Sequence, residues 1–251
     1  MNQPGTTQRA EQLRTNVAKL RARIDAATVA AGRSESPRLI VVTKFHPAAD
    51  VLTLAELGIT DVGENREQEA GPKAAEVAAA GHRLTWHFIG QLQSKKAAKV
   101  LRFSREIHSV DRPSLVTALD GAATRLEQAT QAPVRVGSYL QVDLRTEVAR
   151  TTDSTAARGG VAPADLLTLA ESVAGSDHLD LRGVMAVAPL GEDPRAPFER
   201  LAELSASLVR EHPGATEISA GMSHDLEEAI AIGATRLRIG TEVLGPRPSV
   251  L

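Results

Sequence analysis

Residues 39–47 of this chain read LIVVTKFHP and decide between two fold classes. The first four residues are apolar and mostly β-branched, as is typical of a strand buried on both faces of a parallel sheet. An open doubly wound sheet usually continues its first strand into a glycine-rich G-x-G-x-x-G turn, but this stretch contains no glycine. The stretch therefore favours the other common parallel architecture, a closed (β/α)8 barrel.

Strand-like and helix-like patterns alternate over the rest of the 251 residues. Strands are expected at residues 39–42, 60–63, 84–89, 106–110, 134–142, 181–187, 216–218 and 236–239. Helices are expected at residues 48–57, 66–80, 94–101, 112–128, 163–173, 196–211 and 226–232. The short connections favour parallel strands with helical crossovers, so we predict an α/β fold, a (β/α)8 TIM barrel from about residue 38 to 245.

An additional helix is expected before the barrel. Leu13, Val17 and Leu20 recur at helical spacing, which predicts a helix over about residues 6–31. Residues 145–160 break the alternation, and their Thr, Asp, Ser, Ala, Arg and Gly content predicts a surface loop. Because no linker or internal repeat divides the sequence, residues 1–251 are predicted to form a single domain.

The composition limits the class of protein. Hydrophobic residues make up 42% and charged residues 24%, and the formal net charge of −2 offers no basic surface for nucleic acids or anionic membranes. Cysteine is absent, which excludes disulfides, a thiolate nucleophile and cysteine-ligated metals. No apolar run reaches the roughly 20 residues of a membrane span, and the N-terminus lacks the apolar core of a secretory signal. We therefore expect a cytoplasmic protein, with a monomer as the default.

Lys44 is the first candidate functional residue, because the loops that follow the strands build the active face of a (β/α)8 barrel. It follows the buried strand of residues 39–42, where a lysine at the barrel mouth is partly desolvated and its amine becomes available. Such an amine condenses with a carbonyl compound to a Schiff base. The alternative is a lysine that simply leaves the strand for solvent.

The loops after the last two expected strands are the second candidate. Their donor residues are Ser219, Gly221, Ser223, Gly240 and Thr241. Barrels often bind phosphate after their seventh and eighth strands, where hydroxyls, glycine backbone and a helix N-terminus face an anion. Together with Lys44, these loops predict a ligand that carries an aldehyde and a phosphate. The alternative is that residues 223–226 only cap a helix.

Four further residues occur near the strand ends. Arg238 lies inside the last expected strand, where an inward cation must meet an anion or an acceptor, or else form a structural ion pair. His87 is compatible with a catalytic role or with a satisfied core histidine. Asn65 fits a pocket, a turn or a helix cap, and Met185 lies in the sixth expected strand. No spacing of His, Asp and Glu indicates a metal site.

The motifs that contain these residues resemble the YggS/PROSC family of pyridoxal 5′-phosphate (PLP) homeostasis proteins. They are residues 42–47 (VTKFHP), 63–69 (GENREQE), 86–96 (WHFIGQLQSKK), 109–111 (SVD), 183–186 (GVMA), 218–227 (ISAGMSHDLE) and 238–241 (RIGT). The motifs occur in the family's order between Leu39 and Gly245. The resemblance therefore covers nearly the whole chain.

The resemblance implies a fold type III barrel like the N-terminal domain of alanine racemase, with PLP as its cofactor and no catalytic residue. It implies that Lys44 binds PLP covalently as an aldimine and that Arg238 faces the cofactor, at the phosphate or at the pyridine nitrogen. The residues implied for the phosphate are Ser219, Gly221, Ser223, Gly240 and Thr241. The residues implied to line the rest of the pocket are Asn65, His87 and Met185.

The sequence departs from the family's pattern at a few positions. Ala220 stands where the family usually has Met, and Glu242 and Leu244 replace a small residue and a Phe after the last strand. Asp143 stands where Asn is common, and residues 145–160 differ from a more regular Gly-rich segment. The first three changes bear on the shape of the pocket, and the loop bears on any regulated closure.

The resemblance, together with these residues, predicts a PLP homeostasis protein without catalytic turnover. It would hold the reactive aldehyde and pass it to PLP-dependent apo-enzymes, or keep it from harming other amines. A racemase of the alanine racemase class needs a second base, a tyrosine from a separate domain, and the one tyrosine here, Tyr139, lies inside an expected strand. One alternative is a PLP-dependent enzyme acting on amino acids with Lys44 as its only base. Another is a cofactor-free, aldolase-like barrel in which Lys44 attacks a sugar-phosphate carbonyl, and this protein would be colourless.

Overall fold

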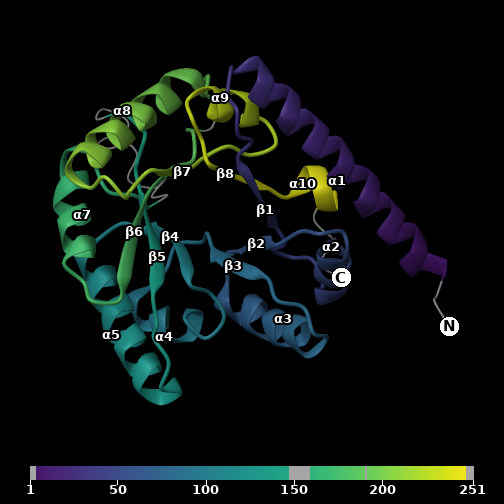
Figure 1. Ribbon diagram of the computed structural model, residues 1–251, viewed down its shortest axis with the longest axis horizontal. Helices are drawn as coiled ribbons and strands as arrows, with labels where there is room; N and C mark the ends of the chain where they lie inside the picture. The colour runs from purple at the N-terminus through teal and green to yellow at the C-terminus, as the bar shows by residue number, and fades with distance from the viewer. Residues whose placement is uncertain (1–3, 147–158, 190, 247–251) are drawn as a thin grey trace.

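The computed structural model describes residues 4–146, 159–189 and 191–246, and within them eight parallel strands close into a barrel (Figure 1). The strands are β1 (Arg38–Val42), β2 (Asp61–Glu64), β3 (Thr85–Phe88), β4 (Glu106–Val110), β5 (Val136–Gln141), β6 (Leu179–Met185), β7 (Glu217–Ser219) and β8 (Arg236–Ile239). Each strand pairs with its neighbour in sequence, and β8 pairs with β1. The predicted (β/α)8 barrel is confirmed.

Helices surround the barrel, and their positions follow the predicted pattern with two main differences. They are α1 (Pro4–Ala30), α2 (Ala48–Glu56), α3 (Glu67–Ala79), α4 (Ala97–Val100), α5 (Pro113–Thr130), α7 (Leu166–Ala174), α8 (Arg195–Glu211), α9 (Leu226–Ala231) and α10 (Thr241–Leu244). The helix expected over residues 94–101 is a 3-10 turn (Ser94–Lys96) followed by the short α4. Helix α10 follows β8, where no helix was expected.

A side-chain hydrogen bond holds the connection between α4 and β4. The hydroxyl of Ser104 donates to the carbonyl oxygen of Trp86 (2.6 Å) and so ties the chain to β3 just before β4 begins. Of the predicted loop at residues 145–160, residues 147–158 lie outside the described part of the chain. None of the helices in the described ranges has the length and apolar character of a membrane-spanning helix.

The main hydrophobic core lies between the outside of the barrel and the helices. Alternate side chains of each strand point outward into this layer, as period-two geometry requires. Examples are Val41, Val62, Ile107, Leu140, Val184 and Leu237, all of them buried. Phe198 and Leu201 of α8 pack into the same cluster from the helical side.

The inside of the barrel is polar, whereas barrels of this kind are usually filled by Val, Ile and Leu. Tyr139 of β5 donates its hydroxyl hydrogen across the interior to Glu217 of β7 (2.6 Å). Arg236 of β8 forms a salt bridge with the same carboxylate (2.8 Å). Burial, together with the Glu217 carboxylate, raises the pKa of Tyr139. Paired polar side chains therefore take the place of an apolar filling.

Helix α1 crosses the outside of the barrel against α9 and α10 (Figure 1). Its predicted apolar stripe is buried there, with Leu13 and Leu20 fully covered. Arg23 forms salt bridges with Glu227 of α9 (2.7 Å) and Glu242 of α10 (2.8 Å). Helix α1 thus covers the part of the barrel where the crossover helices are short.

We expect Gly183→Ala to lower the free energy of unfolding by about 3 kcal/mol, because backbone strain and overpacking both arise there. Gly183 has a φ of +150°, and a Cβ at this position would overlap the backbone of Glu217 on β7. Urea denaturation followed by circular dichroism measures the change. Gly214→Ala is the matched control, because nothing lies within 4 Å of a Cβ there. Equal losses in the two variants would contradict this account of β6.

Candidate functional site

A cavity of about 300 Å³ opens at the end of the barrel where the strands finish. It is lined by Val42, Lys44, Phe45, His46, Ile89, Met185, Val187, Met222, Ser223, His224, Arg238, Gly240, Thr241 and Gly245. The residues of the predicted site that lie in this lining are Lys44, Met185, Ser223, Arg238, Gly240 and Thr241. The end of β1 and the loops after β7 and β8 therefore meet at one cavity.

Lys44 reaches the cavity because side chains alternate along β1 and its continuation. Val42 lines the cavity, Thr43 points outward to Glu64, and Lys44 points inward again. Phe45, the next residue, has a φ of +70°, a left-handed conformation that costs energy for any residue but glycine. The backbone therefore turns sharply just after Lys44 and leaves its side chain at the cavity.

The backbone just before Lys44 is held by a buried ion pair. The hydroxyl of Thr43 and the ammonium of Lys73 both donate to Oε1 of Glu64 (2.7 and 2.6 Å). Lys73 also donates to the carbonyl oxygen of Thr43 (2.9 Å). Burial raises the pKa of Glu64, although Lys73 opposes the shift. Helix α3, which carries Lys73, thus fixes the strand residue that precedes Lys44.

Arg238 places a buried cation at the cavity. Its Nη1 donates to the hydroxyl oxygen of Ser219 (2.7 Å) and its Nη2 donates to the carbonyl oxygen of Ala186 (2.7 Å). Within the described ranges no salt bridge joins Arg238 to a carboxylate, so the structural ion pair considered from the sequence is not observed there. Burial lowers the pKa of Arg238 to about 10, partly offset by the more distant Asp225, and the guanidinium stays charged at neutral pH. A buried cation of this kind favours an anion or an electron-rich acceptor in the cavity.

A chain of hydrogen bonds runs from Arg238 down the inside of the barrel. Ser219 Oγ lies 2.9 Å from Nδ1 of His108. His108 Nε2 lies 2.9 Å from Nδ1 of His87, whose Nε2 lies 2.9 Å from Oδ1 of Asp61. One assignment of hydrogens satisfies every partner, with each donor pointing away from Arg238 toward the Asp61 carboxylate. Burial, with nearby positive charge, lowers the pKa of His108 well below its ordinary value, which agrees with the neutral ring in this assignment.

Four residues of the predicted site lie outside the cavity lining, namely His87, Ser219, Gly221 and Asn65. His87 is 2% exposed and uses both ring nitrogens inside the barrel, which matches the satisfied core histidine considered from the sequence. Ser219 is fully buried and contacts Arg238, so it bears on the cavity only through that residue. Gly221 has a φ of +93°, and a Cβ there would collide with Ala229 and Leu237. Its small size therefore serves the packing of the loop against α9 and β8.

Asn65 lies in a separate depression of about 410 Å³. Its neighbours in this lining include Gln91, Gln93 and Lys96, and its Oδ1 is buried without a hydrogen-bond partner in the described ranges. A Cβ at Gly90 would overlap the backbone of Asn65, so the loops after β2 and β3 are packed directly on each other here. The structure therefore does not bring Asn65 into the lining that contains Lys44.

The loops after β7 and β8 form part of the cavity wall. A Cβ at Gly240 would lie 3.0 Å from a carbonyl oxygen of β1, so glycine lets the two chains approach closely. The helix after β7 begins at Leu226, as expected, and Asp225 accepts a hydrogen bond from the loop backbone (2.5 Å). The hydroxyls of Ser223 and Thr241 have no hydrogen-bond partner among the described residues. These two hydroxyls are therefore free to bind a ligand.

Sequence reasoning missed several residues of the lining. Met222 and His224 flank Ser223, so extending the prediction from single donors to the whole loop would have included them. Ile89 follows His87 by two residues and shares its inward face. His46 lies in the motif of residues 42–47 but was not singled out. Burial lowers its pKa, although Asp50, 3.4 Å away, opposes the shift.

The departures from the family pattern after β7 and β8 do not line the cavity. Ala220 and Leu244 are buried in the outer hydrophobic core, and Glu242 faces Arg23 of α1. Asp143 pairs with Arg145 (2.8 Å) just before the undescribed residues. The first three changes therefore alter the packing of the helical layer rather than the lining.

Comparison with known proteins places this geometry in a family. A profile of the family described as "Alanine racemase, N-terminal domain" matches residues 10–248. The chain is 39% identical over 231 residues to a pyridoxal phosphate homeostasis protein of Corynebacterium glutamicum, which covers 91% of this chain and 99% of the relative. The chain belongs to the pyridoxal phosphate homeostasis protein family.

Solved structures agree with this membership. PipY of Synechococcus elongatus PCC7942, solved with PLP bound, is 33% identical to this chain, with a TM-score of 0.77 over 93% of this chain and all of that chain. The alanine racemase of Clostridium difficile 630 is only 13% identical, with a TM-score of 0.68 over 95% of this chain and 58% of that chain. The second likeness shows a shared barrel fold and nothing more.

The lining of the cavity fits the chemistry of PLP, a pyridine aldehyde that carries a phosphate. A half-buried amine at Lys44 matches the aldehyde, and two unpartnered hydroxyls beside Gly240 match the phosphate. The buried cation of Arg238 matches the remaining polar edge of such a ligand. The volume lies at the lower end of the range for small-molecule pockets.

We expect the hydrogen-bonded chain to make stability depend on pH through His108. The folded protein keeps this ring neutral, whereas the unfolded chain takes up a proton there below about pH 6.5, so stability is lost as the pH falls below that value. Replacing His108 by Asn should remove up to about 1.4 kcal/mol per pH unit of this dependence. Urea denaturation of both proteins between pH 5 and 7 measures the difference. Identical slopes would show that folding does not lower the pKa of His108.

Proposed function

We propose that this protein binds PLP in the cavity at the barrel mouth and holds it for delivery to other proteins. The observation that carries the proposal is that Lys44 and the buried cation Arg238 line one small cavity beside two loops with free hydroxyls. Membership in the homeostasis family and the likeness to PLP-bound PipY support it. When bound, the aldehyde of PLP supplies a carbon that forms a Schiff base with the amine of Lys44.

The two ends of the cavity would hold different parts of the ligand. We assign the phosphate to the loops after β7 and β8, where Ser223, Gly240 and Thr241 offer hydroxyl and backbone donors. Arg238 lies two residues before Gly240, deeper along β8, and we assign it to the pyridine nitrogen. A charged guanidinium there disfavours protonation of that nitrogen, because adjacent positive charges repel. By keeping that nitrogen unprotonated, Arg238 would make the pyridine ring a weaker electron sink. A weaker electron sink suits storage of the cofactor better than stabilisation of a substrate carbanion.

A second base for racemisation is not supplied by tyrosine in this chain. The hydroxyl of Tyr139, the one tyrosine of the sequence, is hydrogen-bonded to Glu217 inside the barrel, and its raised pKa keeps it protonated, so it cannot accept a proton at neutral pH. His46 lines the cavity, but it comes from the same loop as Lys44, and its Nδ1 lies 3.4 Å from the carboxylate of Asp50. We therefore propose a carrier role, with PLP-dependent apo-enzymes as recipients.

Lys44→Ala tests the attachment. We expect the purified wild-type protein with PLP to absorb visible light, and borohydride to add the reduced mass of one PLP to the peptide that contains Lys44. The variant should fold normally and lose both signals, because no amine remains at that position. Lys95→Ala, an exposed lysine outside the cavity, is the control and should behave as wild type. A wild-type protein that stays colourless and unmodified with PLP would favour the aldolase-like alternative.

The carrier role predicts transfer without turnover. We expect the PLP-loaded protein to reactivate a PLP-dependent apo-aminotransferase, and to show no steady conversion of L- or D-amino acids when it is incubated with them alone. The reactivation rate and chiral chromatography of the amino acids measure the two outcomes. Steady racemisation or decarboxylation that disappears in Lys44→Ala would establish the enzyme alternative instead.

A further inference from the structure

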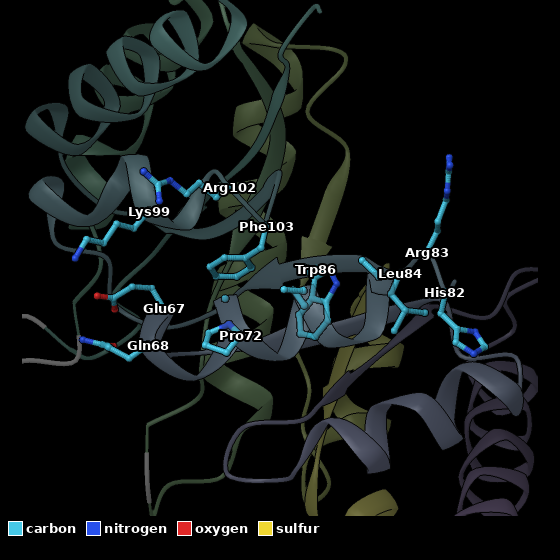
Figure 2. Close-up of a pocket in the computed structure, with 14 residues that line it drawn as sticks. Glu67, Gln68, Pro72, His82, Arg83, Leu84, Trp86, Lys99, Arg102 and Phe103 are labelled. Atoms are coloured by element: carbon cyan, nitrogen blue, oxygen red, sulfur yellow. The ribbon is translucent and has the colours of Figure 1, made fainter. Parts of the chain in front are cut away.

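An apolar groove of about 770 Å³ lies on the outside of the barrel between α3 and α4, and we call it the α3–α4 groove (Figure 2). Trp86 and Phe103 form its floor and meet edge to face, with ring centroids 6.4 Å apart. Pro72, Ala75 and Ala78 of α3 form one wall, and all three are exposed. The groove shares no lining residue with the cavity that contains Lys44.

The groove follows α3 from one end to the other. Glu67 in the first turn of α3 lies at one end, and His82, just beyond the last turn, lies at the other (Figure 2). Thirteen helical residues rise by about 20 Å, which is longer than a single small metabolite. A segment of polypeptide matches this length.

The short α4 explains why the groove is open. The four residues of α4 leave uncovered a part of the outer layer where a (β/α)8 barrel normally places a full crossover helix. The barrel has a comparable gap at α9 and α10, and there α1 packs over it. Among the described residues no such helix covers the α3–α4 groove. The shape that would complete the layer is therefore a helix.

The charge along the groove indicates which kind of helix would bind. Arg83, Lys99 and Arg102 line the groove and are exposed, and no salt bridge or side-chain hydrogen bond joins them to another residue in the described ranges. The carboxylate of Glu67 is already paired with Lys96 (2.9 Å). An apolar floor with unpaired cations along its edges complements a helix with one apolar face and acidic flanks.

We propose that the α3–α4 groove binds an acidic amphipathic helix of another protein. Apolar side chains of that helix would cover Trp86, Phe103 and the small residues of α3. Its carboxylates would meet Lys99 and Arg102 at one edge and Arg83 at the far end. This interaction does not rest on cofactor binding, because the groove and the cavity are built from different residues.

A synthetic helix of about 14 residues, long enough to span about 20 Å, serves as the probe. It carries Leu at i, i+3, i+4 and i+7 on one face, Glu elsewhere and no tryptophan. Two comparison peptides serve as controls. One has the same composition in scrambled order, and the other keeps the Leu positions but has Lys in place of Glu. Because Trp86 is the one tryptophan of the chain, its fluorescence reports binding at the groove floor, and anisotropy of a labelled peptide gives the affinity.

Three variants of the full protein locate the binding. Lys99→Glu/Arg102→Glu should weaken binding of the acidic peptide by about tenfold and strengthen binding of the Lys peptide, because the charge at this edge of the groove is reversed. Ala75→Glu, at an exposed position of α3, should weaken binding of the acidic peptide, because the larger side chain occupies space in the groove and its negative charge repels the peptide. Lys19→Glu/Arg125→Glu changes the net charge equally at exposed sites outside the groove and should leave binding unchanged.

Binding of the acidic peptide with a change in Trp86 fluorescence, lost in the groove variants and kept in the control, would establish the proposal. Failure of the acidic peptide to bind, or equal binding of the scrambled peptide, would overturn it. So would equal weakening by the control variant. Binding of duplex RNA or anionic vesicles that Lys99→Glu/Arg102→Glu removes, with no binding of the peptide, would assign the cations to a different kind of partner.

Discussion

Pairing between the first and last strands of the barrel is the constraint on which the site depends. Ile40 pairs with Arg238 and Val41 with Ile239, although nearly the whole chain separates them in sequence. This register brings the end of β1, which carries Lys44, beside the loop that begins at Gly240. An open sheet with the same strands would leave Lys44 and the loop after β8 at opposite edges.

Helix α1 stabilises this closure from outside. Arg9 donates to the carboxylate of Asp50 in α2 (2.7 Å) and to the carbonyl oxygen of Leu244 in α10 (2.9 Å). Asn16 donates to the carbonyl oxygen of Val243 in α10 (2.9 Å). These contacts join the helix after β1 to the helix after β8, across the line where the barrel closes. The same helix that fills the gap at α9 and α10 therefore also joins the helices that follow the first and last strands.

The polar interior of the barrel is the second condition for the site. A buried arginine needs hydrogen-bond acceptors, and Ser219 and Ala186 provide them without neutralising the charge. Ser219 in turn is held by the histidines beneath it, so the guanidinium has a fixed orientation. A barrel filled by Val, Ile and Leu could not hold a cation at that depth. The groove outside α3 shows the opposite arrangement, an apolar surface with free cations at its edge, which suits a partner rather than a cofactor.

The sequence by itself determined the kinds of elements, their order and the face on which Lys44, Ser223, Gly240 and Thr241 meet, because every strand of a parallel barrel ends on the same face. It did not determine how deep inside the barrel each inward side chain lies. His87 and Ser219 point inward like Arg238, yet they form hydrogen bonds inside the barrel instead of lining the cavity. Alternation along a strand decides only between inside and outside, whereas the stagger between neighbouring strands decides how far along the barrel axis each side chain lies. The brevity of α4 and the covering position of α1 were likewise decided by tertiary contacts, because local propensity does not report which surface remains to be covered.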